Sequence, residues 1–189
     1  MRTLRTFIAI PIAQKIASRL EKAQQSCREM ARLRVSWVPP ESMHVTLKFL
    51  GEIAFELLPD VTLVVQEATR GMPPLHIQVA RLGTFPESGD PKVIWAGVTD
   101  EPGGSLSRIA ERLDRSLVPL GIRRERRPFE AHLTIGRVRQ FDDPAGFERF
   151  IRRRKQNEYG QQRIEEVHVM SSELSPKGSM YDVVARVKL

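Results

Sequence analysis

Short runs of β-branched and aromatic residues alternate along the chain with segments whose apolar residues recur at helical spacing. Strand-like runs occupy residues 3–10 and 91–98. Helical periodicity follows each of these runs, at residues 14–32 and 103–120. Strands and helices mixed in this way predict an α+β protein.

Two further strand-like runs carry the same polar motif. The run HVTL begins at His44 and the run HLTI begins at His132, so in both a threonine follows a histidine by two positions. A strand that only filled a core would carry apolar residues at these positions. The recurrence therefore indicates that the histidine and threonine have a functional role rather than a role in core packing.

The two motifs lie 88 residues apart, and other segments correspond at about the same offset. These are the helical segments 55–68 and 143–156 and the strand-like segments 75–82 and 163–170. Each half is thus predicted to contain a strand, a helix, the motif-bearing strand, a helix and a strand. A turn at residues 175–179 is expected to lead into a last strand at 180–189.

We expect residues 1–189 to form one domain, whose repeat halves are approximately residues 1–88 and 89–189. Residues 83–91 are predicted to form the loop between the halves. Two pseudo-symmetric lobes should each carry an antiparallel sheet with helices on the outside. A central cleft is expected between the bilobal halves of this α+β fold.

The composition indicates a folded protein, but it does not decide what the net positive charge is for. Hydrophobic residues make up 41% of the chain, and the formal net charge is +7. Arginine and lysine concentrate at residues 123–127 and 152–155. These runs fit either a solvated surface or a patch that binds a polyanion such as nucleic acid.

Cysteine usage and hydropathy bound the cellular location. Cys27 is the single cysteine, so a disulfide framework is excluded and a reducing cytoplasm is expected. No apolar run reaches the roughly 20 residues that a membrane helix needs. Residues 1–14 lack the features of a signal peptide. We therefore predict a cytoplasmic protein with no membrane partner, and a monomer.

Strict alternation of side chains predicts which residues of the first motif share a face. On an ideal strand His44, Thr46 and Lys48 point to one side, whereas Phe49 points to the other with the apolar residues of the run. The imidazole and the hydroxyl then lie roughly 6–7 Å apart along the strand. The same spacing applies to His132 and Thr134.

Two imidazoles and two hydroxyls around one cleft suit the cleavage of a phosphodiester. One histidine can accept a proton from water while the other gives a proton to the leaving alkoxide. The hydroxyls of Thr46 and Thr134 can donate hydrogen bonds to the non-bridging oxygens of the phosphate. We therefore predict paired acid–base catalysis by His44 and His132.

Metal binding and simple packing are the alternatives. Catalytic zinc usually takes three protein ligands, and neither motif contains a cysteine, an aspartate or a glutamate, so no metal and no cofactor is predicted. Two core histidines that bond to nearby backbone would be the structural explanation of the motif. His76 and His168 have no threonine two positions later, and we interpret both as structural or surface residues.

The joint pattern resembles a known family over nearly the whole chain. The segments RTFIAI, WVPPESMHVTLKFLGE, GTFP, FEAHLTIGRV and SELSPKGSMYDVV are similar to those of the two-histidine (2H) phosphoesterases. The nearest group is the RNA 2′,3′-cyclic phosphodiesterases, also called 2′-5′ RNA ligases. Ala131 departs from the pattern, since many members carry proline before the second histidine.

The resemblance implies a metal-independent, bilobal enzyme that opens a terminal 2′,3′-cyclic phosphate of RNA or nucleotides to a 2′-phosphate. His44 matches the proton donor, and His132 matches the proton acceptor that activates water. Thr46 and Thr134 match the phosphate-binding hydroxyls. The reverse reaction, 2′-5′ RNA ligation, is also implied. A non-catalytic module that binds RNA ends is the alternative function.

Other substrate contacts are less directly indicated. Phe49, Trp37 and Tyr181 are candidates for stacking on a base, although alternation directs Phe49 into the core. Arg137 resembles a recurrent basic residue after the second motif and is a candidate for neutralising phosphate. Alternation directs Arg137 away from the cleft unless the strand bulges. Lys48 is predicted to lie on the face of His44.

Overall fold

The computed structural model of the chain describes residues 2–101, 103–175 and 178–189. Its strands are β1 (Thr3–Pro11), β2 (Leu33–Trp37), β3 (His44–Ala54), β4 (Leu75–Phe85), β5 (Val93–Glu101), β6 (His132–Phe141), β7 (Glu158–Ile164), β8 (Glu166–Ser175) and β9 (Gly178–Lys188). Its α-helices are α1 (Gln14–Met30), α2 (Leu58–Thr69), α3 (Ser105–Ser116) and α4 (Pro144–Arg152). Short 3₁₀ turns lie at Pro40–Ser42, Phe55–Leu57 and Val118–Leu120.

The strands of these described residues form one antiparallel sheet in the order β7-β4-β5-β6-β3-β1-β8-β9, with β2 paired to β6. The order is symmetric about its centre. Reading outward from the middle, β6, β5 and β4 stand on one side, and β3, β1 and β8 stand on the other. The predicted mixed α+β architecture is confirmed, and the two motif-bearing strands are neighbours at the centre.

The central junction is the narrowest part of the sheet. β3 and β6 share a single pair, Val45 with Leu133, whereas β1 pairs with β3 from Thr3 to Pro11. The sheet therefore consists of two well-paired halves that meet at one point, which we call the seam. Both halves use strands from the beginning and from the end of the chain, because β8 and β9 join β1 while β2 and β4 join the other half.

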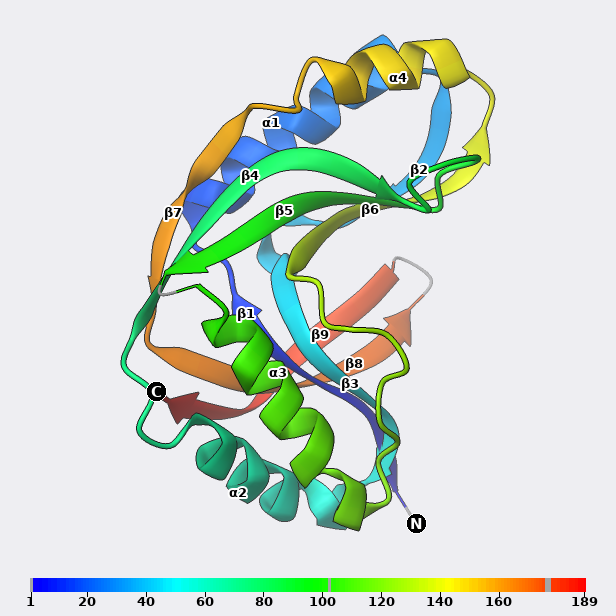
Figure 1. Cartoon of the computed structure of the whole chain (residues 1–189). Helices are drawn as coiled ribbons and strands as arrows, with labels where there is room; N and C mark the ends of the chain where they lie inside the picture. The colour runs from blue at the N-terminus through cyan, green and yellow to red at the C-terminus, as the bar shows by residue number, and fades with distance from the viewer. Residues whose placement is uncertain (1, 102, 176–177) are drawn as a thin grey trace.

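Helices cover one face of each half (Figure 1). α1 packs with α4 and lies against β6 and β7, while α2 packs with α3 on the other half, against β9 and β3. The core lies between helices and sheet, where large side chains such as Leu20, Ile77, Ile8 and Leu113 are fully or almost fully buried. Within the described part of the chain no helix covers the opposite face of the sheet, which we call the open face.

Two strands differ from the prediction. β2, whose five residues pair with β6, was not expected, because the repeat predicted no strand at this place in either half. The predicted strand at residues 163–170 is in fact the end of β7 and the start of β8, which pair with β4 and β1 respectively. The prediction treated this mixed run of apolar and charged residues as one strand, whereas the pairing partner changes at Glu165. Within the predicted turn at 175–179, residues 176–177 lie outside the described residues.

Candidate active site

The seam brings both His-x-Thr motifs together. Val45 and Leu133 are paired and fully buried, so their neighbours along each strand point to the open face. Antiparallel pairing about this bridge places His44 across from Thr134 and Thr46 across from His132. The two imidazoles and two hydroxyls thus alternate around one small area of the open face.

A β-bulge follows the first motif and changes which side chains face the site. Thr46 pairs with Ala9 and Lys48 with Ile8, which leaves Leu47 as the extra residue on β3. One extra residue reverses the alternation beyond it. The faces predicted for Lys48 and Phe49 are therefore wrong, and a second register shift at Leu50 restores the original alternation beyond it.

The bulge sends Lys48 to the helix-covered face and Phe49 to the open face. Lys48 is 3% exposed, and its ammonium group donates hydrogen bonds to Asp114 Oδ1 at 2.8 Å and to the carbonyl of Arg123 at 2.7 Å. Phe49 is 53% exposed and lies with its ring centroid 6.0 Å from that of Phe7. Lys48 is thus a structural residue, and Phe49 is available for stacking.

A matching bulge follows the second motif. Thr134 pairs with Trp95 and Gly136 with Ile94, so Ile135 is the extra residue on β6. The shift brings the exposed Arg137 to the open face. Its charge acts on the imidazole of His44, whose pKa it lowers. Arg137 and Phe49 thus occupy equivalent places after the two motifs.

Both imidazoles have the same orientation. Nδ1 of His44 bonds to the carbonyl of Ser42 at 2.7 Å, and Nδ1 of His132 bonds to the carbonyl of Glu130 at 2.7 Å. A carbonyl oxygen can only accept, so Nδ1 carries a hydrogen in each ring. Nε2 is left as the group that can take or give a proton on the open face.

Aromatic rings surround His44. The ring centroid of Phe7 lies 4.8 Å from that of His44, and the ring of Tyr181 meets the imidazole edge-on at 5.2 Å. Burial lowers the pKa of His44, the bond to the Ser42 carbonyl opposes this effect, and the charge of Arg137 lowers the pKa further. The imidazolium form of His44 is therefore disfavoured relative to a histidine in water.

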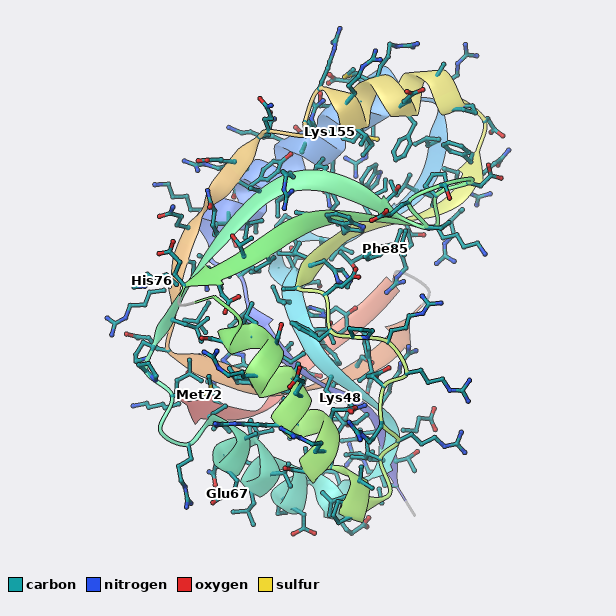
Figure 2. The ribbon with its side chains drawn as sticks, viewed as in Figure 1. Lys48, Glu67, Met72, His76, Phe85 and Lys155 are labelled. Carbon is teal, nitrogen blue, oxygen red and sulfur yellow. The ribbon has the colours of Figure 1, made fainter. Side chains whose placement is uncertain are left out.

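One ring packs against His132. Phe85 meets the imidazole edge-on with centroids 5.1 Å apart, and it also contacts Trp95 at 5.3 Å. Figure 2 shows Phe85 near the end of β4, on the side of the sheet that faces β8 and β9. Phe7 and Phe85 were not singled out as site residues. Phe7 lies on β1, directly beside β3, whereas Phe85 lies on β4, which β5 separates from β6.

Of the other two candidates for stacking on a base, Tyr181 lies at the site and Trp37 does not. Tyr181 reaches the site from β9, through its contacts with His44 and Phe7. Trp37 does not, because it pairs with the buried Gly136, and the guanidinium of Arg28 from α1 lies over its ring. Trp37 thus belongs to the helix-covered face, and its proposed role in stacking is wrong.

The other two histidines lie on strands that carry neither motif. His76 is exposed on β4, near the left edge of the molecule in Figure 2. His168 is 6% exposed and bonds through Nε2 to Glu166 at 2.6 Å. Among the described residues, no group of three or more histidine, cysteine, aspartate or glutamate side chains is arranged to hold a metal ion. No helix of the described chain is long and apolar enough to cross a membrane.

The basic run at residues 123–127 is held beside β3 by ion pairs. Asp114 accepts hydrogen bonds from Lys48, from the backbone N–H of Glu125 and from the guanidinium of Arg124. Burial alone would raise the pKa of Asp114, but these bonds outweigh burial and lower the pKa to about 2. The arginines of this run are exposed on the segment that leads into His132.

Comparison with known proteins identifies one family over most of the chain. The family model described as LigT like Phosphoesterase matches residues 10–95 and 97–181, and each of these segments contains one His-x-Thr motif. An RNA 2′,3′-cyclic phosphodiesterase of Archaeoglobus fulgidus is 33% identical over 94% of this chain and 96% of its own. The enzyme of that name from Methanocaldococcus jannaschii is 30% identical over 96% and 98%.

Solved structures share the fold. A protein of Thermus thermophilus superimposes with a TM-score of 0.82 at 28% identity, with 98% of each chain covered. LigT of E. coli complexed with 3′-AMP superimposes with a TM-score of 0.76 at 21% identity, with 100% of this chain and 99% of its own covered.

Proposed function

Because the chain belongs to the LigT-like phosphoesterase family, we propose that it hydrolyses the terminal 2′,3′-cyclic phosphate of RNA to a 2′-phosphate by paired-histidine catalysis. The observation that carries the proposal is the pair of imidazoles on one open face, each held by a backbone carbonyl at Nδ1, with no hydrogen bond at Nε2 from the described residues. The names of the relatives support the choice of substrate.

The proposed reaction places the cyclic phosphate at the seam. His132 accepts a proton from water through Nε2, and the water oxygen bonds to phosphorus. The bond from phosphorus to O3′ breaks, and His44 gives its Nε2 proton to that oxygen. Thr46 and Thr134, which alternate with the imidazoles around the seam, donate hydrogen bonds to the non-bridging oxygens. The 2′-ester bond remains.

His44 must be protonated before it can act as the donor. Its lowered pKa in the free protein disfavours the imidazolium, but the negative charge of a bound phosphate favours it. Substrate binding therefore helps to charge the donor. Arg137, on the same face, is proposed to share the phosphate charge.

The aromatic rings near His44 are proposed to receive the terminal base. Phe49 is exposed, and Tyr181 and Phe7 surround the donor imidazole. A ribose whose O3′ lies at His44 would place its base on this side of the seam. Stacking on an aromatic ring contributes about 1–3 kcal/mol per base and is tolerant of sequence.

The same arrangement supports ligation. If a 5′-hydroxyl of RNA replaces water beside His132, the product is a 2′-5′ phosphodiester, so we propose ligation as a second reaction of the same site. We also propose that the enzyme acts as a monomer in the cytoplasm, on RNA ends or cyclic nucleotides. The buried thiol of Cys27 suits a reducing compartment.

Incubation with 2′,3′-cyclic AMP in excess EDTA tests the proposal, with the product identified by phosphorus NMR. A 2′-phosphate as the sole product is expected, because neither imidazole needs a metal for proton transfer. A 3′-phosphate would contradict the assignment of the leaving oxygen. Binding without turnover would favour a module that only recognises RNA ends, and loss of activity restored by zinc would favour metal catalysis.

A further inference from the structure

A hollow lies on the open face beside His132. Its volume is about 310 Å³, and its lining includes Gly97 and Ala80 together with Arg81 and Lys155. Gly97 and Ala80 are paired on β5 and β4 and form the floor. Figure 2 labels Lys155, which belongs to the connection between α4 and β7.

The hollow is continuous with the candidate active site. Gly97 pairs with His132 in the register of β5 and β6, so the two residues are direct neighbours on one face of the sheet. Gly97 has no side chain to separate the imidazole from the hollow. A Cβ atom at this position would stand 3.0 Å from the carbonyl oxygen of Ala80. The hollow therefore extends the site outward from His132, on the side away from His44.

Arg81 is placed so that its side chain reaches this floor. It is the extra residue of a β-bulge in β4, between Ala80 and Leu82, and its backbone φ is 59°. Glycine and asparagine adopt this conformation more readily than arginine does. One guanidinium nitrogen of Arg81 lies 4.0 Å from the position that a Cβ on Gly97 would take. The bulge thus directs a cation toward the neighbour of His132.

The charge of the hollow is unpaired and mainly positive. Among the residues that the structure describes, no carboxylate lies within ion-pair distance of Arg81 or Lys155. Glu158 is the one acidic residue of the lining, and no aromatic side chain lines the hollow. Such a surface suits a phosphate and a sugar better than a base, whereas the aromatic rings gather on the side of His44.

On the premise of the function proposed above, we propose that the hollow binds a phosphodiester of a neighbouring RNA nucleotide, with Arg81 and Lys155 as its phosphate ligands. The phosphodiester can come from the strand that carries the cyclic phosphate or from a second strand. In the second case a 5′-hydroxyl lies where water would react. Its oxygen bonds to phosphorus, the bond to O3′ breaks, His132 takes the hydroxyl proton and His44 protonates O3′.

The first arm of the test compares substrates of different length. We would measure kcat and KM for a 2′,3′-cyclic mononucleotide and for a trinucleotide that ends in a 2′,3′-cyclic phosphate. Arg81→Gln and Lys155→Gln are each expected to raise KM for the trinucleotide by about tenfold, as for loss of one charge-assisted hydrogen bond. Turnover of the mononucleotide should stay unchanged, and Arg81→Lys should recover part of the loss. Arg115→Gln on α3 removes an equal charge from the helix-covered side and is the control.

The second arm tests the other source. A 5′-hydroxyl dinucleotide is added to the cyclic mononucleotide, and the ratio of ligated to hydrolysed product is measured. If Arg81→Gln lowers the ratio of ligated to hydrolysed product but leaves KM for the trinucleotide unchanged, the hollow binds the phosphodiester of the second strand. Unchanged values in both arms, or equal losses for the mononucleotide, would overturn the proposal.

A binding measurement separates this proposal from the function on which it rests. A trinucleotide that ends in a 3′-phosphate cannot react, so its binding can be measured by titration into each protein. It should bind more weakly to Arg81→Gln than to the unaltered protein. The slope of the logarithm of the binding constant against the logarithm of the salt concentration should fall by about one unit, as for the loss of one phosphate contact. If the unaltered protein turns over no cyclic mononucleotide, the proposed function fails, while this titration still reports on the hollow. Equal binding by both proteins would refute the hollow as a phosphate site.

Discussion

Replacement of Arg137 by glutamine tests the bulge, the electrostatics of the site and the order of proton transfer together. Arg137 faces the site only because Ile135 is an extra residue on β6. Its charge is one cause of the lowered pKa of His44. Arg137→Gln should therefore weaken phosphate binding and raise the pKa of His44 in the free protein.

The weaker phosphate binding should lower kcat/KM, whereas the loss of the charge should raise the pKa of His44. A hydrogen bond to a charged group contributes about 1.5–3 kcal/mol, which corresponds to a loss of roughly 10- to 150-fold in kcat/KM. Arg137 is exposed to water, so we expect a loss near the lower end of this range. The pKa of His44 should rise because a repelling cation has been removed, whereas its burial remains.

The assay is the pH dependence of kcat/KM for a cyclic mononucleotide, which reports the free protein. A group that must be protonated controls the alkaline limb. If His44 is the donor, Arg137→Gln should move the alkaline limb to higher pH and leave the acidic limb in place. Movement of the acidic limb alone would make His44 the base, and the proposed order would be wrong. A profile with both limbs unmoved would contradict the placement of Arg137 beside His44.

Three further outcomes are expected. Lys48→Met should lower the free energy of unfolding, measured by denaturant titration, by about 2–3 kcal/mol, because it removes the buried partner of Asp114. An unchanged unfolding midpoint would refute the role of Lys48 in anchoring residues 123–127. The pKa of Asp114 is lowered to about 2, so the ionised carboxylate contributes fully to the free energy of unfolding above about pH 4. This contribution is lost as the pH falls toward 2. In Asp114→Asn the free energy of unfolding should therefore lack this decrease between about pH 4 and pH 2. Phe49→Ala should raise KM for cyclic nucleotides by roughly tenfold at unchanged kcat if the ring stacks on a base, and equal KM values would contradict stacking.

The faces of the two motifs could be predicted from the sequence, but the residues beyond them could not. The two-residue period places each histidine with its threonine, and the structure agrees for both strands. The period fails at Leu47 and Ile135, where an extra residue reverses the side chains that follow, as far as the next register shifts at Leu50 and Arg139. Both extra residues are ordinary aliphatic residues, so their own identity does not reveal the bulges, although Gly136 directly after Ile135 is a local sign of the second one.

Pairing across the chain was the other limit. The repeat predicted equivalent elements, and it did not reveal that β8 joins β1 while β4 joins β5. These pairings decide which rings reach each imidazole, as Tyr181 does at His44 and Phe85 does at His132. Trp37 was misplaced for a similar reason, because the strand that contains it was not expected. Local periodicity describes one strand, whereas a site at a seam depends on its neighbours.

The central claim is that the two imidazoles act as one acid–base pair across the seam. The most direct test is single-turnover hydrolysis of a 2′,3′-cyclic nucleotide by His44→Ala, by His132→Ala and by the double variant, with unfolding midpoints measured for all three. Each single variant should lose about 10²- to 10⁴-fold in rate at an unchanged midpoint, and the double variant should be little slower than either. Losses that multiply in the double variant, or full activity in either single variant, would contradict the account.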